Sequence, residues 1–310
     1  MALESGKPSV AVVGATGVGL VYVLSRQPEN GETLVAESMR VMPGGKASNQ
    51  AIGVARLGGT ARLFSALGGD VFASYVREAW RQAQVDAEAV IELSEQSSLV
   101  GSVLVDPAGD NRIVLALGAM AHYSPSHLDP FEAGIADSEV CLVSLEMSPE
   151  PAERALAIAR EHGVITVLNP APAPDEASAR RLLPLCDWVT PNAVEAATMS
   201  AEDDPAAAAR TLRELGARNV VVTLGGEGAL LHTGDITEVI PATDVQCVDT
   251  SGAGDAFNAA FALSLARGHT PAEAVRRGCI AGGLIVQGPG FVDALHLLDD
   301  FDAMLKWQDG

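Results

Sequence analysis

One acidic side chain follows a pair of glycines in the last quarter of the chain. Residues 249–255 read Asp-Thr-Ser-Gly-Ala-Gly-Asp, directly before an apolar helical pattern. Glycine lets the backbone approach a ligand, and the free N–H groups of Gly252, Ala253 and Gly254 at a helix start bind anions. Asp255 beside such an anion site could take a proton from a hydroxyl that attacks a phosphate. The alternative is that Asp255 only caps the helix.

A second glycine pair lies near the amino end, where residues 44–51 read Gly-Gly-Lys-Ala-Ser-Asn-Gln-Ala. The pair opens a helix rich in small residues, so Gly44 and Gly45 would expose backbone N–H groups beside Lys46 and Asn49. These groups could bind a polar ligand. The alternative is a glycine loop with one exposed lysine.

Three further groups follow strand-like runs. Glu146 comes after the apolar run 140–144, where a carboxylate can bind hydroxyls, although a solvated loop acid has the same pattern. Asn192 and Glu195 are three residues apart and share a helix face, as ligands or as a capping box. The turn 223–228, Thr-Leu-Gly-Gly-Glu-Gly, suits either phosphate binding or a tight hairpin.

Composition restricts the partners. The net charge of −20 argues against nucleic acid or an anionic membrane as a partner. A phosphate site must therefore be built locally, from backbone N–H groups, a few basic residues and a divalent cation. The four widely spaced cysteines are typical of buried free thiols in a cytosolic protein, and we find no signal peptide or membrane span. We expect a soluble, cytoplasmic protein.

Apolar runs alternate with helical patterns along all 310 residues, which predicts an α/β fold with a mostly parallel sheet. The runs 100–105 and 112–117 flank a turn and predict a projecting hairpin. The run 245–248 predicts a strand directly before the motif at 249–255. Gly14 to Gly19 could open a dinucleotide-binding fold, but Pro28 and Gly31 come too early for a crossover helix.

The two glycine motifs and the turns at 192–195 and 223–228, in this order, resemble the signatures of the ribokinase family, also called the phosphofructokinase B family of carbohydrate kinases. The resemblance implies one domain over residues 1–310. Its fold would be a ribokinase-like three-layer α/β/α sandwich with a small β lid formed by about 15–41 and 97–118. The implied reaction transfers the γ-phosphoryl group of ATP to a primary hydroxyl of a sugar, with Asp255 as the general base.

The resemblance also implies roles for individual residues. Sugar contacts fall on Gly44, Gly45, Lys46, Asn49, Glu146 and Asp255. Nucleotide contacts fall on Asn192, Thr223, Gly225, Gly228 and Gly254, while Gly252, Ala253 and Gly254 form the anion hole. Magnesium would be ordered through water by Asn192 and Glu195. Potassium would be held by Asp249, Ser251, Ile285, Gly288 and Gly290, and the lids of two subunits would pair in a homodimer.

The sequence departs from this family pattern at four positions. Gly17 and Gly19 stand where ribokinases carry an Asn and an Asp that bind sugar hydroxyls, and Met120 replaces a further Asn. A site without those partners should recognise ribose less well. The acceptor therefore stays open between a sugar and a nucleoside, and a catalytically weak sugar-binding protein is the alternative. Ala294 replaces a family Ser at the potassium site, so monovalent-cation dependence also stays open.

Overall fold

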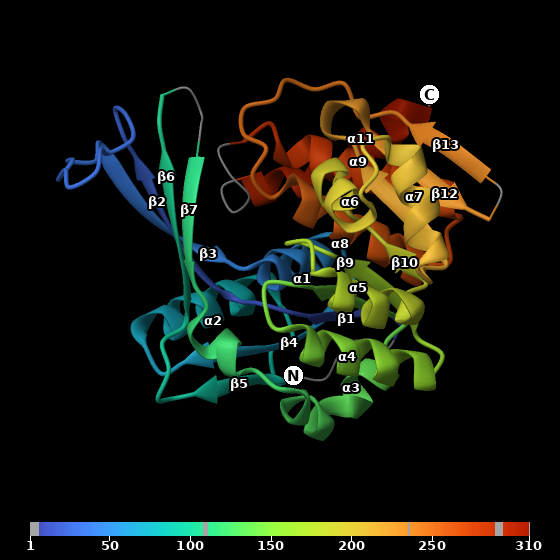
Figure 1. Cartoon of the computed structure of the whole chain (residues 1–310), viewed down its shortest axis with the longest axis horizontal. Coiled ribbons are helices and arrows are strands. Elements are labelled where there is room, and N and C mark those ends of the chain that lie inside the picture. Colours follow the sequence, from blue (N-terminus) through green and yellow to red (C-terminus); the bar gives the residue numbers. More distant parts are fainter. Residues whose placement is uncertain (1–5, 108–110, 235, 289–293, 310) are drawn as a thin grey trace.

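The computed structural model describes residues 6–107, 111–234, 236–288 and 294–309. Its centre is a nine-stranded sheet in the order β13-β12-β11-β10-β9-β8-β1-β4-β5 (Figure 1). Neighbouring strands from β5 to β11 run parallel, and only the edge formed by β12 and β13 is antiparallel. The strands are β1 Ser9–Val13, β4 Thr60–Gly68, β5 Val90–Leu93, β8 Val140–Ser144, β9 Ile165–Asn169, β10 Trp188–Val189, β11 Asn219–Thr223, β12 Ala229–Thr233 and β13 Ile236–Ile240.

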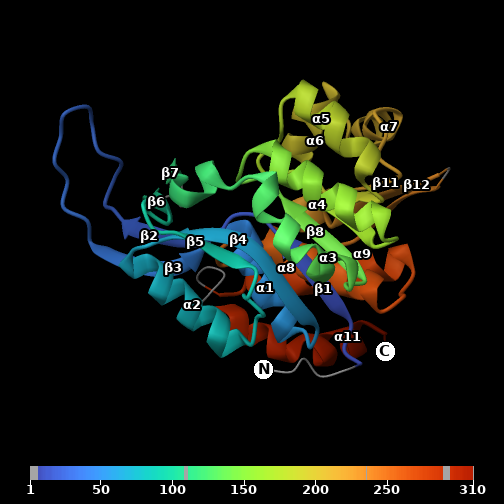
Figure 2. The same cartoon turned by 90° about the horizontal axis from the view of Figure 1, so that it is seen from below.

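Helices cover both faces of this sheet, which confirms the predicted three layers (Figure 2). All five residues of β1 are buried, and its alternate side chains enter two cores. Val10 and Val12 belong to the core that includes α1, α8 and α9, whereas Ala11 and Val13 belong to the core that includes α4 and α7. The helices are α1 Lys46–Arg56, α2 Val71–Ala83, α3 Glu132–Ala136, α4 Pro149–Glu161, α5 Glu176–Leu182, α6 Ala193–Ser200, α7 Pro205–Glu214, α8 Ala253–Ala266, α9 Pro271–Ile285 and α11 Phe301–Asp309.

A second sheet of four strands, in the order β3-β2-β6-β7, projects from one side of the molecule (Figure 1). Its strands are β2 Gly17–Val23, β3 Ser38–Gly44, β6 Leu99–Val105 and β7 Asn111–Ala116. The antiparallel pair β6 and β7 is the predicted hairpin, although residues 108–110 of its turn lie outside the described residues. We call this sheet the lid. Because β2 occupies the segment after Gly14, no crossover helix follows the first strand as a dinucleotide-binding fold requires.

Two sequence predictions were wrong in the segment between β13 and α8. Residues 245–248 form no strand, because the amides of Val248 and Asp249 both donate to the carbonyl of Val286, at 2.7 and 3.1 Å, instead of joining the sheet. Cys247 in this segment is consequently exposed, whereas the other three cysteines are buried as predicted. No helix in the described ranges is long and apolar enough to cross a membrane.

Candidate active site

The glycine turn before α8 leaves backbone donors free. Gly252 caps the helix in the left-handed region, with φ 80°, a conformation that favours glycine. The amide of Ala253 donates to the carbonyl of Thr250 at 3.2 Å, while the amides of Gly252 and Gly254 meet no acceptor in the described part of the protein. Free amides at a helix start attract anions, so this turn can hold a phosphate.

Asp255 lies in the first turn of α8 and is only 8% exposed. Its carboxylate does not cap the helix. Oδ2 accepts from Asn49 Nδ2 at 2.8 Å, and Oδ1 accepts from Gln50 Nε2 at 3.1 Å. Burial raises the pKa of Asp255 to about 6, although Lys46 and the two amide donors oppose the rise. The group is therefore ionised at neutral pH and is a stronger base than an exposed aspartate.

Lys46 and Glu146 form a charged pair beside Asp255. The backbone amide of Lys46 donates to Glu146 Oε2 at 2.8 Å, and its Nζ lies 3.5 Å from Oε1 of the same carboxylate. Burial alone would lower the pKa of Lys46, but the nearby carboxylates of Asp255, Glu146 and Glu195 raise it. The ammonium group therefore stays charged. Gly45 caps α1 with φ 86°, and a Cβ there would meet the carbonyl oxygen of Ala15 at 2.4 Å.

Asn192 and Glu195 form a capping box at the start of α6, as one reading of the sequence predicted. The Asn192 side-chain oxygen Oδ1 accepts from the backbone amide of Glu195, and Glu195 Oε2 accepts from the backbone amide of Asn192, both at 2.8 Å. Burial raises the pKa of Glu195, against the effects of the Asn192 amide and of Lys46. A backbone bridge between Asn192 and Thr223 joins the start of α6 to the end of β11.

A pocket of about 400 Å³ adjoins the glycine turn. Thr223, Gly225 and Gly228 line one side, on the turn that joins β11 and β12 and is closed by a bond of 2.8 Å between the Leu224 amide and the Gly228 carbonyl. The opposite side is formed by α8 and α9, and its apolar lining includes Phe257, Val245 and Val286. Of the predicted nucleotide residues, Thr223, Gly225, Gly228 and Gly254 line this pocket, whereas Asn192 is not among its lining residues.

The residues predicted to hold potassium are arranged around the end of α9. Asp249 Oδ1 accepts from the Ser251 amide at 2.8 Å, and the Ile285 carbonyl accepts from the Gly288 amide at 3.1 Å. A Cβ on Gly288 would meet the Ala294 Cβ at 2.7 Å, so Ala294 lies against this loop without offering an oxygen ligand. Gly290 lies outside the described residues.

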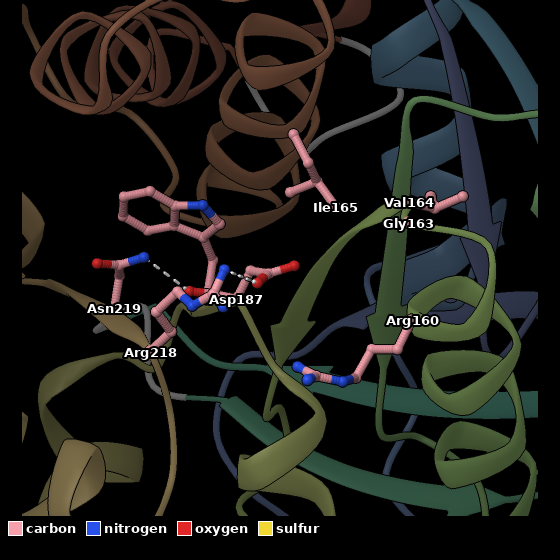
Figure 3. A pocket seen from close by; sticks show the side chains of 8 residues that line it. Arg160, Gly163, Val164, Ile165, Asp187, Arg218 and Asn219 are labelled. Atoms are coloured by element: carbon pink, nitrogen blue, oxygen red, sulfur yellow. Dashed lines mark hydrogen bonds and ion pairs between the residues drawn. The ribbon is translucent and has the colours of Figure 1, made fainter.

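Another hollow, of about 410 Å³, lies at the amino ends of β9, β10 and β11 (Figure 3). Thr223, in contrast, lies at the carboxyl end of β11. Arg218 points across the hollow to Asp187, at 3.0 Å. The other oxygen of Asp187 accepts from the Thr166 amide at 3.0 Å. Neither the two glycine turns nor Asp255 is among the residues that line this hollow.

Comparison with known proteins identifies the family. The model of the pfkB family carbohydrate kinases matches residues 7–296. A ribokinase of Haemophilus influenzae is 32% identical over 289 residues, 92% of this chain and 94% of that protein. A deoxyribokinase of Salmonella typhi is 30% identical over 302 residues, covering 96% and 98%. The structure of an Arabidopsis thaliana ribokinase complexed with ribose and ATP has a TM-score of 0.83 and 25% identity, covering 94% and 98%.

The chain therefore belongs to the pfkB family of carbohydrate kinases, and the predicted family and ribokinase-like fold are confirmed. It is an ATP-dependent carbohydrate kinase. Sequence reasoning gave no role to Gln50 or Asn169, whose side chains are joined at 3.1 Å behind Asp255. Gln50 belongs to the motif at 44–51, but its contact with Asn169 joins segments 119 residues apart and has no local signal.

Proposed function

We propose that the kinase transfers the γ-phosphoryl group of ATP to a primary hydroxyl of a sugar or of a compound that contains a sugar. The observation that carries the proposal is the position of Asp255: a buried carboxylate with a pKa of about 6, one residue after the free amide of Gly254. Asp255 takes the proton of the attacking hydroxyl, and the free amides of Gly252 and Gly254 stabilise the charge on the transferred group.

Asn192 and Glu195 are the residues we expect to place magnesium. The described residues contain no group of three acidic, histidine or cysteine side chains that could hold a metal directly. That fits Mg²⁺, which keeps several waters and binds mainly through nucleotide phosphates. Such an ion would neutralise charge on the phosphates. Glu195 retains Oε1 outside the capping box, so this oxygen can accept from a metal-bound water.

We also propose that a potassium ion is held by Asp249, Ser251, Ile285, Gly288 and Gly290. Carbonyl oxygens at the end of α9 support it, and Ala294 removes one ligand that the family pattern expects. Because this ligand is missing, we expect activity to depend on potassium less strongly than it would with the full set of ligands. Replacing potassium by a bulky organic cation in an ADP-release assay tests this.

The acceptor is a sugar that needs few hydroxyl contacts from the lid. Gly17 and Gly19 offer none. A Cβ on Gly17 would meet the Leu99 carbonyl oxygen at 2.1 Å, so a side chain there requires β6 to move, whereas a Cβ on Gly19 meets nothing within 4 Å. Pentoses that lack a hydroxyl suit this surface, as does a nucleoside. The name of the Salmonella relative, deoxyribokinase, favours the first class.

Asp255→Asn tests the base assignment. The variant keeps the shape of the side chain but has no carboxylate, so we expect kcat to fall by about 10²–10⁴-fold while ATP binding changes little. Turnover is followed by ADP release, and ATP binding by calorimetry. Wild-type turnover in the variant would show that another group removes the proton.

A panel of pentoses, deoxypentoses, hexoses and nucleosides, also read by ADP release, identifies the acceptor. We expect one class to give a kcat/KM at least tenfold above the others, because each unpaired buried polar group costs about 1–3 kcal/mol. Silence across the whole panel would favour the alternative, a sugar-binding relative with weak catalysis.

We further propose that residues 1–310 form a single kinase domain, in which segments 15–41 and 97–118 form the lid. We also propose that the enzyme is cytoplasmic and acts on small molecules.

A homodimer in which the lids of two subunits pair is supported by exposed apolar side chains on the lid sheet. Met39, Ile113, Val114 and Leu115 are between 44% and 68% exposed.

A further inference from the structure

A set of buried polar side chains lies directly behind Asp255. Gln50 is fully buried, Thr190 and Asn258 are each 1% exposed, and Asn169 is 6% exposed. They come from α1, β9, α8 and the residue that follows β10, so four segments meet at this point. Burying an amide costs free energy unless its hydrogen bonds are formed. A buried group of this size therefore requires specific partners.

The direction of the hydrogen bonds in this group is fixed by one backbone oxygen. The carbonyl of Thr190 can only accept, and Asn169 Nδ2 donates to it at 3.2 Å. Asn169 must then turn Oδ1 toward Gln50, whose Nε2 donates to it at 3.1 Å. The same Nε2 donates its other proton to Asp255 Oδ1 at 3.1 Å. Gln50 is thus held with its donor, and not its oxygen, facing the carboxylate.

A second arm reaches the backbone next to Asp255. Thr190 Oγ1 donates to Asn258 Oδ1 at 2.6 Å, and Asn258 Nδ2 donates to the carbonyl of Gly254 at 2.8 Å. Gly254 directly precedes Asp255, so the two arms form a closed ring through Thr190. The ring holds both the side chain of Asp255 and the backbone that carries it against the central sheet.

We propose that Gln50 is a positioning residue for phosphoryl transfer, which keeps Asp255 ionised and oriented because Asn169 and Thr190 fix its donor. The proposal rests on the proposed role of Asp255 as the base. An amide donor stabilises the ionised form of a buried carboxyl, and Gln50 acts in this direction on the pKa of Asp255. The oxygen of Gln50 has no partner among the described residues, so its nitrogen alone holds the side chain.

The test is the pH profile of kcat/KM for Gln50→Leu and Gln50→Glu. We expect the acid limb of Gln50→Leu to move up by about one pH unit, because a donor to the carboxylate is lost. Gln50→Glu should move it further, since a second carboxyl then faces Asp255. In both variants kcat should fall more than the KM for ATP rises.

Ser48→Ala is the matched control, because Ser48 is also buried on α1 but accepts from Trp80 Nε1 at 2.8 Å and is not part of the ring. Its acid limb should coincide with that of the wild type. Asn169→Ala removes the group that orients Gln50 without touching Asp255, so a smaller shift in the same direction is expected even if the Gln50 variants fold poorly. An unchanged acid limb in folded Gln50→Leu, or in folded Asn169→Ala, would overturn the proposal.

Asp255→Asn distinguishes the proposed role of Asp255 as the base from the proposed role of Gln50 in positioning it. If that variant is inactive while the Gln50 and Asn169 variants keep the wild-type profile, Asp255 remains the base and only the positioning role is lost. If Asp255→Asn turns over normally, the proposed function itself fails, whatever the other profiles show.

Discussion

The raised pKa of Asp255 has a cost for folding that can be measured. Its ordinary value is 3.8, and burial raises it to about 6 in the folded state. Between these pH values the folded protein binds a proton that the unfolded chain has released, so stability falls as pH rises through this window. The loss is complete about one pH unit above the folded-state pKa and is on the order of 3 kcal/mol.

Asp255→Asn should therefore lack this loss. Between pH 5 and pH 7.5, we expect the free energy of unfolding of the wild type to decrease by about 1 kcal/mol more than that of the variant. Urea denaturation at the two pH values measures both. Parallel changes in the two proteins would contradict the raised pKa.

At the scale of single elements, strand β2 of the lid offers a paired test of the acceptor site. Gly19→Asp adds a carboxylate where a Cβ meets nothing within 4 Å, so we expect a change in stability within about 1 kcal/mol. If the side chain reaches the acceptor, kcat/KM for D-ribose relative to 2-deoxyribose should rise about tenfold, the effect of one charged hydrogen bond.

Gly17→Asn is the contrasting variant on the same strand. Because its Cβ would meet the Leu99 carbonyl oxygen at 2.1 Å, we expect a loss of about 1–3 kcal/mol of stability, measured by urea denaturation. A fully stable Gly17→Asn protein would mean that β2 and β6 separate easily and that the lid is looser than this contact indicates.

The elements were predictable where a local pattern decides the structure. The apolar run 140–144 is β8 without any change of bounds, and α1 begins at Lys46, directly after the glycine pair. Residues 245–248 look like a strand locally, but they contact the end of α9, which no sequence window contains. The ring behind Asp255 has the same cause, since Gln50 and Asp255 are 205 residues apart. Local patterns therefore predicted the glycine turns and not the groups that support them.

At the scale of the whole molecule, the exposed lid predicts self-association. Val114 is 68% exposed on β7, and an aspartate there should weaken a lid-to-lid contact by desolvation and like-charge repulsion. Val239→Asp is the control, because Val239 is 57% exposed on β13, at the far edge of the main sheet. Sedimentation velocity should give a dimer for the wild type and the control and a monomer for Val114→Asp. A monomeric wild type would exclude the dimer.

The separation of the two halves of the site along the chain also affects how the enzyme is made. Asn49 contacts a carboxylate 206 residues further along, and α1 packs against α8. During synthesis on the ribosome, α1 emerges long before α8. The face of α1 that α8 covers in the folded protein therefore stays exposed for most of translation. The nascent chain lacks Asp255, the proposed base, until α8 is synthesised. Incomplete chains should therefore be inactive and prone to aggregate, and they are natural clients for chaperones.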